Sequence, residues 1–251
     1  MRETDFVSGF ARGLTVIEAF DETRPKLSIA EASKITGLDR ATVRRSLLTL
    51  SELGYADYDG KFFALTPKIL RLGHAYLSAT PLPTIIQPYL DQLSDRAGQS
   101  ASASVLDGTE IVYIARASQK RVMSINLTTG SRLPAYCASM GRVWLAALPE
   151  HEAREILARS NLKANTPHTK TDPEDLIAEL RRVRDQGYAL IDQELELGLC
   201  SIAVPLENDR GRIVAALNIG APAAHVAAAE MAERYLPLLK ETQAALRLVL
   251  R

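Results

Sequence analysis

The sequence predicts an α+β protein of two domains, in which an N-terminal winged helix-turn-helix is followed by a linker helix and a C-terminal domain with an antiparallel sheet. Three observations predict this fold. Capped helical segments precede a hairpin within the first 65 residues, prolines interrupt the chain near residue 80, and strand-like and helical segments mix after it. A chain of 251 residues is long enough for two domains with separate cores.

Two predicted helices separated by a short turn define the helix-turn-helix. Ser28 and Glu31 form a capping box at the start of one helix, and Gly37 supplies its stop. Asp39 is an N-cap for the next helix, which Gly54 ends. The inward stripe of this second member of the pair is Val43, Leu47 and Leu50.

The segments on either side complete the first domain and its link to the second. A helix predicted over residues 9–21 has an apolar face of Phe10, Ala11, Leu14 and Ile17. Asp59-Gly60 lies between two short strand-like runs and predicts a hairpin. Thr66-Pro67 then opens a linker helix. We therefore expect a DNA-binding domain over residues 1–65, a linker helix over 66–80, and a second domain over 81–251.

The helix after Asp39 carries the side chains of a DNA-reading element. Its N-terminal residues would lie nearest the base edges, with arginines for guanine or phosphate and alanine for a thymine methyl. The residues expected to contact DNA are Arg40, Ala41, Thr42, Arg44 and Arg45 of this helix, Arg12 of the first helix and Lys61 of the hairpin. A run of arginines is more often only a solvated helix face. The caps, the short turn and the hairpin together favour DNA binding, and Leu48 is assigned to packing.

The second domain mixes strands and helices. The expected strands cover residues 100–108, 110–117, 122–127, 188–191, 201–209 and 212–220, and the expected helices cover 137–148, 150–160, 174–186 and 223–250. This order indicates an antiparallel sheet covered by helices.

Composition bounds the location and the chemistry of the chain. Hydrophobic residues make up 47% and charged residues 24%, and 30 basic residues balance 30 acidic ones, so DNA binding must come from a local basic patch. The N-terminus lacks the apolar core of a secretion signal, and no apolar run approaches the roughly 20 residues that span a bilayer. The two cysteines match no disulfide framework. We expect a cytoplasmic protein with no membrane partner.

Five long stretches resemble one family of regulators. RGLTVIEAF, GLDRATVRRSLLTLSELGY, SASVLDGTEIVYIAR, GSRLPAYCASMGRVWLAAL and DQELELGLCSIAVPL are similar to signature stretches of IclR-type bacterial regulators, and within them of those for protocatechuate, 4-hydroxybenzoate and β-ketoadipate catabolism. The resemblance implies that residues 81–251 form a GAF/PAS-like effector-binding and oligomerisation domain. It also implies a dimer or tetramer, a palindromic double-stranded operator and a small organic acid as effector. Trp144 and Cys200 depart from the family pattern.

The segment SRLPAYCASMG has the features of a site for a small carboxylate. Pro134 precedes a helix whose first N–H groups lack partners, and Ala138, Ser139 and Gly141 are small enough for a ligand to approach them. By resemblance, the pocket is lined by Leu133, Tyr136, Ser139, Met140, Ser201, Asn218 and Gly220. Arg132 and Arg142 are further candidates for neutralising a carboxylate. Small residues that only pack a helix on a sheet are the alternative interpretation.

An enzyme acting on a small aromatic acid is one alternative class, and a DNA-binding module without a ligand is another. The four histidines are scattered, and no nucleophile elbow, phosphate loop or zinc motif is present. Asp192, Glu194 and Glu196 alternate before Gly198, as a strand edge or loop would, although they could imitate a catalytic carboxylate set. The sequence therefore predicts no catalytic residues, no metal site and no cofactor.

Overall fold

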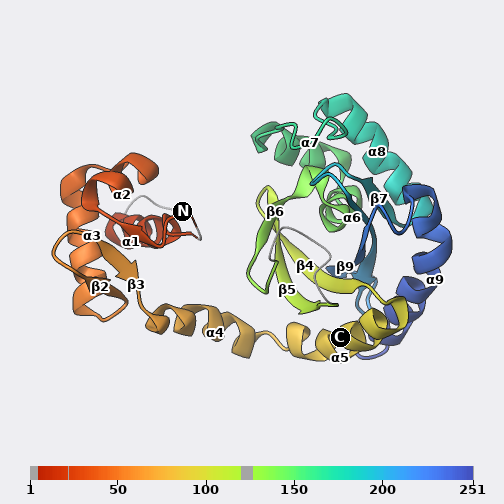
Figure 1. Cartoon of the computed structure of the whole chain (residues 1–251), viewed down its shortest axis with the longest axis horizontal. Coiled ribbons are helices and arrows are strands. Elements are labelled where there is room, and N and C mark those ends of the chain that lie inside the picture. The colour runs from red at the N-terminus through yellow and green to blue at the C-terminus, as the bar shows by residue number, and fades with distance from the viewer. Residues whose placement is uncertain (1–4, 22, 120–126, 251) are drawn as a thin grey trace. The chain divides into compact units, whose positions relative to one another are not determined.

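The computed structural model describes residues 5–21, 23–119 and 127–250. The chain divides into two compact units, Met1–Thr80 and Pro81–Arg251 (Figure 1). No helix of the described residues is long and apolar enough to cross a membrane.

The first unit is a winged helix-turn-helix. Its helices are α1 (Ser8–Glu18), α2 (Ile29–Thr36) and α3 (Arg40–Glu52), and its strands are β1 (Lys26–Leu27), β2 (Ala56–Tyr58) and β3 (Phe63–Leu65). The strands pair in the order β1-β3-β2, so the hairpin β2–β3 gains a third strand from the segment before α2. The unit ends with a short 3-10 helix η2 (Pro67–Ile69) and with α4 (Leu70–Ala79).

The predicted caps of this unit are confirmed. The Ser28 hydroxyl accepts the Glu31 N–H at 3.3 Å, and the Glu31 carboxylate accepts the Ser28 N–H at 2.8 Å. The Asp39 carboxylate accepts the Thr42 N–H at 2.9 Å. Gly37 stands between α2 and α3 at φ 71°, a left-handed conformation that costs glycine little.

The core of the first unit confirms one predicted face and corrects another. Val43, Leu47 and Leu50 of α3 are buried, as their spacing predicts. The predicted apolar face of α1 is wrong at two positions, because Phe10 is 69% exposed and Leu14 is 39% exposed, whereas Ile17 packs against the core. The buried residue of α1 is Val16, and Ala19 is buried directly after the helix.

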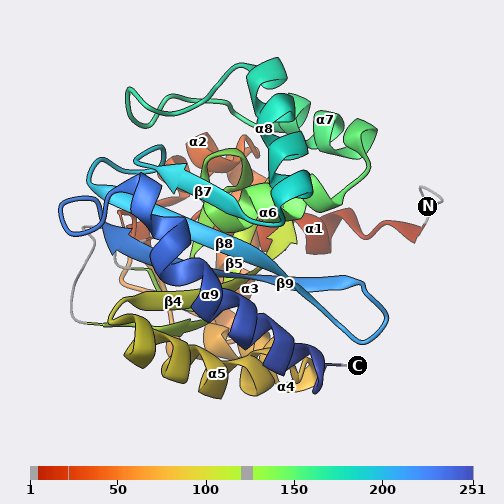
Figure 2. The same ribbon diagram turned by 90° about the vertical axis from the view of Figure 1, so that its right-hand side faces the viewer.

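The second unit is one antiparallel sheet with helices on both faces. The strands β4 (Ser100–Asp107), β5 (Glu110–Ala117), β6 (Arg132–Pro134), β7 (Ala189–Asp192), β8 (Leu199–Glu207) and β9 (Ile213–Pro222) stand in the order β6-β5-β4-β9-β8-β7. Helices α5 (Leu82–Ala97) and α9 (Ala228–Arg247) cover one face (Figure 2). The other face carries η3 (Ala135–Cys137) and α6 (Ser139–Ala147), with α7 (Glu150–Arg159) and α8 (Pro173–Gln186) packed beyond α6.

Each face has its own apolar core. The expected elements stand in the expected order, but helix α5 was not predicted, because Pro83 and Pro88 indicate interruptions of a helix. The predicted turn between β4 and β5 is confirmed, with Gly108 at φ 63°. Strand β6 was not expected, because a three-residue run that ends in a proline carries little strand signal. The strand expected over residues 122–127 lies outside the described residues except for Leu127, which is buried.

Glycine at position 141 is dictated by packing. A Cβ added at Gly141 would lie 2.2 Å from the carbonyl oxygen of Ala135, which is backbone and cannot rotate away. The space beside Gly141 is therefore filled by the backbone of η3, and not by a ligand as the sequence had suggested. The interpretation of Gly141 as room for a ligand is wrong.

We predict that Gly141→Ala lowers the free energy of unfolding by about 1–3 kcal/mol, the usual cost of an overpacked core. The matched control is Gly220→Ala, since a Cβ there would lie 3.7 Å from a Leu199 methyl carbon, an ordinary contact. Urea unfolding followed through the fluorescence of the single tryptophan, Trp144 on α6, measures both variants. Equal stability of the two variants would contradict the packing role of Gly141.

Candidate functional site

The outer face of α3 carries a patch of cations. Arg40, Ala41, Arg44 and Arg45 are all exposed, as are Arg12 on α1 and Lys61 in the turn of the hairpin β2–β3. None of these cations forms an ion pair with another described residue, so their charges remain available to a ligand or partner. Leu48 packs against the core of the unit, as predicted.

Thr42 does not belong to this patch. Its side chain is only 6% exposed, and it lies on the side of α3 that faces α1, one helical step around from Ala41. The Thr42 hydroxyl accepts a hydrogen bond from Arg45 at 3.4 Å. The prediction of Thr42 as a DNA contact is wrong, because helical spacing places this residue at the edge of the buried stripe.

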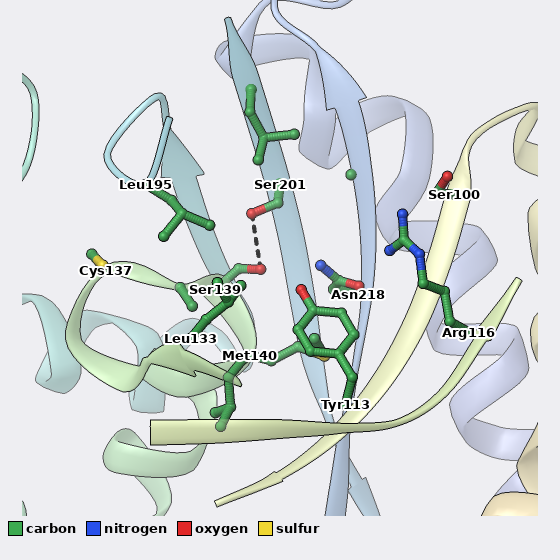
Figure 3. Close-up of a pocket in the computed structure, with 14 residues that line it drawn as sticks. Ser100, Tyr113, Arg116, Leu133, Cys137, Ser139, Met140, Leu195, Ser201 and Asn218 are labelled. Atoms are coloured by element: carbon green, nitrogen blue, oxygen red, sulfur yellow. Dashed lines mark hydrogen bonds between the residues drawn. The ribbon is translucent and has the colours of Figure 1, made fainter. Parts of the chain in front are cut away.

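A cavity lies between the α6 side of the sheet and the β7–β8 loop in the second unit (Figure 3). Six of the seven residues predicted for the pocket line it, namely Leu133, Ser139, Met140, Ser201, Asn218 and Gly220. Their role in ligand binding stays a prediction. The cavity volume is about 20 Å³, which is enough to hold roughly one water molecule.

Tyr136 is the predicted pocket residue that lies elsewhere. Its hydroxyl donates to the carbonyl oxygen of Lys163 at 2.5 Å and accepts the Lys163 N–H at 3.1 Å. These bonds hold the segment before α8 against η3. Tyr136 therefore has a structural contact where the sequence suggested a ligand contact.

The polar atoms of the cavity include one acceptor without a partner. The Oδ1 atom of Asn218 is buried and makes no hydrogen bond with the described residues. The Ser201 hydroxyl donates to the Ser139 hydroxyl at 3.0 Å, at the first residue of α6. No side chain caps this helix, so its first N–H groups lack a side-chain acceptor, and its first two residues line the cavity. Buried polar groups without partners are uncommon and indicate a place where a ligand or water binds.

One positively charged side chain among the described residues lines the cavity, that of Arg116, which was not predicted from the sequence. Its side chain is half-buried, and it donates to the hydroxyls of Ser102 at 2.8 Å and Ser118 at 3.1 Å. No described carboxylate pairs with it. Burial lowers the pKa of Arg116 from its usual value, and burial raises the pKa of the neighbouring Tyr113 to about 12. A guanidinium stays protonated despite such a shift.

A β-bulge explains why alternation did not reveal Arg116. Ser104 pairs with Tyr113 while Ala103 pairs with Ala115, which leaves Ile114 as an extra residue in β5. Strict alternation would place Tyr113 and Arg116 on opposite faces. The extra residue brings both to the cavity face. The side chains of Arg116, Asn218, Ser139 and Ser201 converge on the cavity (Figure 3).

The two arginines proposed from sequence do not reach the cavity. Arg132 is exposed and pairs with Asp107 at 2.8 Å and Glu110 at 2.7 Å. Arg142 is 1% exposed and forms two hydrogen bonds with the Glu194 carboxylate, at 2.8 and 2.5 Å. Both are therefore wrong as carboxylate receptors. Glu194, from the acidic series before Gly198, is the buried counter-ion of an arginine.

Trp144 and Cys200, the two departures from the family pattern, both make contacts within the second unit and do not line the cavity. Trp144 donates its indole N–H to the Ser104 carbonyl at 3.1 Å. Cys200 lies in the core between the sheet and helices α5 and α9, away from the cavity, and burial raises the pKa of its thiol to about 12. Among the residues that the structure describes, no cluster of His, Cys, Asp or Glu could hold a metal ion.

Comparison with protein families assigns both units to one class of protein. A model described as the IclR helix-turn-helix domain matches residues 10–60, and the model described as "Bacterial transcriptional regulator IclR C-terminal" matches residues 74–247. The chain belongs to the IclR family of bacterial transcriptional regulators, and it is a regulator and not an enzyme.

Three relatives illustrate the similarity. The Pca regulon regulatory protein of Pseudomonas putida is 50% identical over 238 residues, which cover 94% of this chain and 82% of that protein. The p-hydroxybenzoate hydroxylase transcriptional activator of Acinetobacter baylyi is 37% identical over 252 residues, 98% of this chain and 93% of that protein. A crystal structure of a double mutant of the PobR inducer-binding domain from Acinetobacter, in complex with 3-hydroxybenzoic acid, is 35% identical with a TM-score of 0.62, covering 66% of this chain and 97% of that one.

Proposed function

We propose that this protein regulates genes of aromatic-acid catabolism by binding operator DNA through α3 and an aromatic acid in the cavity of the second unit. The observation that carries the proposal is the half-buried Arg116 guanidinium, which faces a cavity and has no described carboxylate partner. The names of the relatives support the aromatic class, because they include a Pca regulon regulator and an inducer-binding domain with 3-hydroxybenzoic acid.

The cavity residues suggest how such an acid would lie. The carboxylate would pair with Arg116, since a guanidinium matches a planar carboxylate with two hydrogen bonds. The ring would lie among Leu133, Tyr113 and Met140. A ring hydroxyl would donate to the Asn218 oxygen that lacks a partner. The acid is larger than the present cavity, so binding must move side chains such as Leu195 in the β7–β8 loop.

The DNA-binding unit would place α3 in the major groove. Arg40 and Arg44 would reach guanine or phosphate, and Ala41 would contact a thymine methyl. Arg45, Arg12 and Lys61 would contact phosphates beside the groove. In this proposal residues 1–65 bind DNA, and residues 66–80 connect the two domains. Residues 81–251 bind the acid and form the contacts of the oligomer.

An exposed apolar surface on the first unit supports a dimer. Its large exposed side chains include Phe10 and Leu14 on α1, Leu53 after α3, and Leu70, Leu72 and Tyr76 on α4. None of the α4 side chains that the structure describes is buried, and an isolated ten-residue helix is marginal in water. A second copy of the chain would cover this surface and place two α3 helices on a palindromic operator.

We predict that Arg44→Ala weakens operator binding by about 5- to 150-fold, the value of one good base contact. Thr42→Val should change it by no more than about twofold, because Thr42 is buried and valine has the same shape. Fluorescence anisotropy with labelled operator gives both affinities. Unchanged binding by Arg44→Ala, or loss of effector binding in its place, would exclude α3 as the DNA-reading helix.

We predict that Arg116→Met lowers the affinity for 4-hydroxybenzoate or protocatechuate by about 10- to 150-fold, because a hydrogen-bonded charge pair is lost. Arg132→Met is the control, since this arginine is exposed and pairs with surface carboxylates. Isothermal titration calorimetry measures both variants. If the Arg116 variant binds as tightly as the natural protein, the carboxylate is held elsewhere.

We predict that Leu72→Asp disrupts pairing of the first units, because it puts a charge into the apolar surface. Binding to a palindromic operator should then change from one cooperative step to separate half-site steps in a gel-shift titration. Leu197→Asp, at an exposed leucine of the second unit, serves as the control. A single cooperative step with the Leu72 variant would refute the proposed surface.

A further inference from the structure

The amide side chain of Gln87 on α5 holds the backbone of the cavity arginine. Its Nε2 donates to the Arg116 carbonyl oxygen at 3.1 Å, and its Oε1 accepts the Arg116 N–H at 3.3 Å. The same Nε2 donates to Asp91 at 2.8 Å, one turn further along α5. One side chain therefore joins β5 to α5 at the residue whose guanidinium faces the cavity.

Gln87 lies beside a stretch of β5 whose outer side no described strand covers. β6 pairs with β5 only from Glu110 to Val112, so β6 does not reach the backbone of Arg116. A primary amide has one donor and one acceptor side, and Gln87 gives the Arg116 peptide groups the two bonds that another strand would give. A shift of β5 at Arg116 would therefore move or break the two hydrogen bonds of Gln87.

The first turns of α5 lack one of the helix hydrogen bonds that would join them to the rest of the helix. Pro88 lies inside α5 and has no N–H to donate to the carbonyl of Thr84. The part of α5 before Pro88 runs from Leu82 to Gln87, and its Ile86 is fully buried against the sheet. Leu82 comes two residues after Thr80, where the first unit ends.

We propose that Gln87 is a positioning residue that transmits effector binding from Arg116 to the start of α5 and so to the chain that leads to the DNA-binding unit. This inference rests on the proposed function. An effector carboxylate would draw the guanidinium from the Ser102 and Ser118 hydroxyls, and the backbone of Arg116 would follow. Gln87 would carry that shift to the turn before Pro88. Effector and operator are then coupled through a state that each binds with different affinity.

The test measures coupling, which a purely structural contact would leave unchanged. The effector dissociation constant is determined for the whole protein, free and operator-bound, with 4-hydroxybenzoate and with protocatechuate as probes. The ratio of the two constants is the coupling factor. Gln87→Met keeps the length of the side chain and removes its hydrogen bonds. We expect this variant to move the ratio toward one by about threefold or more. The effector affinity of the free protein and the operator affinity of the effector-free protein should each stay within about twofold of the natural values.

Two further variants complete the experiment. Gln92→Met makes the same chemical change on the same helix at an exposed residue that makes no described hydrogen bond to β5, and it should keep the natural ratio. Gln87→Glu keeps the acceptor for the Arg116 N–H but sets a carboxylate oxygen against the Arg116 carbonyl oxygen and the Asp91 carboxylate, so it should also move the ratio toward one. A natural ratio in both Gln87 variants would overturn the inference and leave the proposed function intact. Failure of the natural protein to bind either acid would overturn the proposed function itself.

Discussion

The buried pair of Arg142 and Glu194 holds together the walls around the cavity. Besides its two bonds to Glu194, Arg142 donates to the Tyr136 carbonyl at 2.9 Å, and Glu194 accepts the Lys170 N–H at 3.0 Å. One ion pair thus connects α6, η3, the β7–β8 loop and the segment before α8. Burying two charges is costly unless every bond is made, so neither partner is free to serve a ligand. That constraint leaves Arg116 as the cation that faces the cavity.

The two arginines have opposite uses because their partners differ. Arg142 has a buried carboxylate and fixes structure, whereas Arg116 has only hydroxyl partners and keeps its charge available. Hydroxyls give a guanidinium hydrogen bonds without neutralising it, so an incoming carboxylate can replace them. The small volume of the cavity means that binding also requires movement. In the proposed mechanism, recognition of the acid and rearrangement of the second unit are one event, which Gln87 would transmit to α5.

The sequence predicted most of the fold because local signals agreed with the tertiary structure. Ser28, Asp39 and Gly108 stand at the caps and turn that their chemistry indicates. The prediction of α1 was wrong in its inward face, since periodicity gives the spacing of apolar residues but not whether a partner covers them. Phe10 and Leu14 are apolar and exposed, which periodicity alone cannot distinguish from core.

The candidate site was predicted less completely, for reasons of geometry. Family resemblance gave six lining residues, but the bulge at Ile114 changed the face of Arg116 and hid it from the alternation rule. Tyr136 and Gly141 were each misplaced because their close contacts come from segments that approach only in the folded chain. Such contacts have no signature in local spacing.

Thermal unfolding of the natural protein with three acids, and with the amide of one of them, tests most directly whether the cavity recognises a carboxylate. The compounds are 4-hydroxybenzoate, protocatechuate, β-ketoadipate and the neutral 4-hydroxybenzamide. A ligand that binds only the folded state raises the transition temperature. We predict a rise with at least one acid and none with the amide. A rise with the amide equal to that with its acid, or no rise with any of the three acids, would contradict a cavity in which Arg116 holds the ligand.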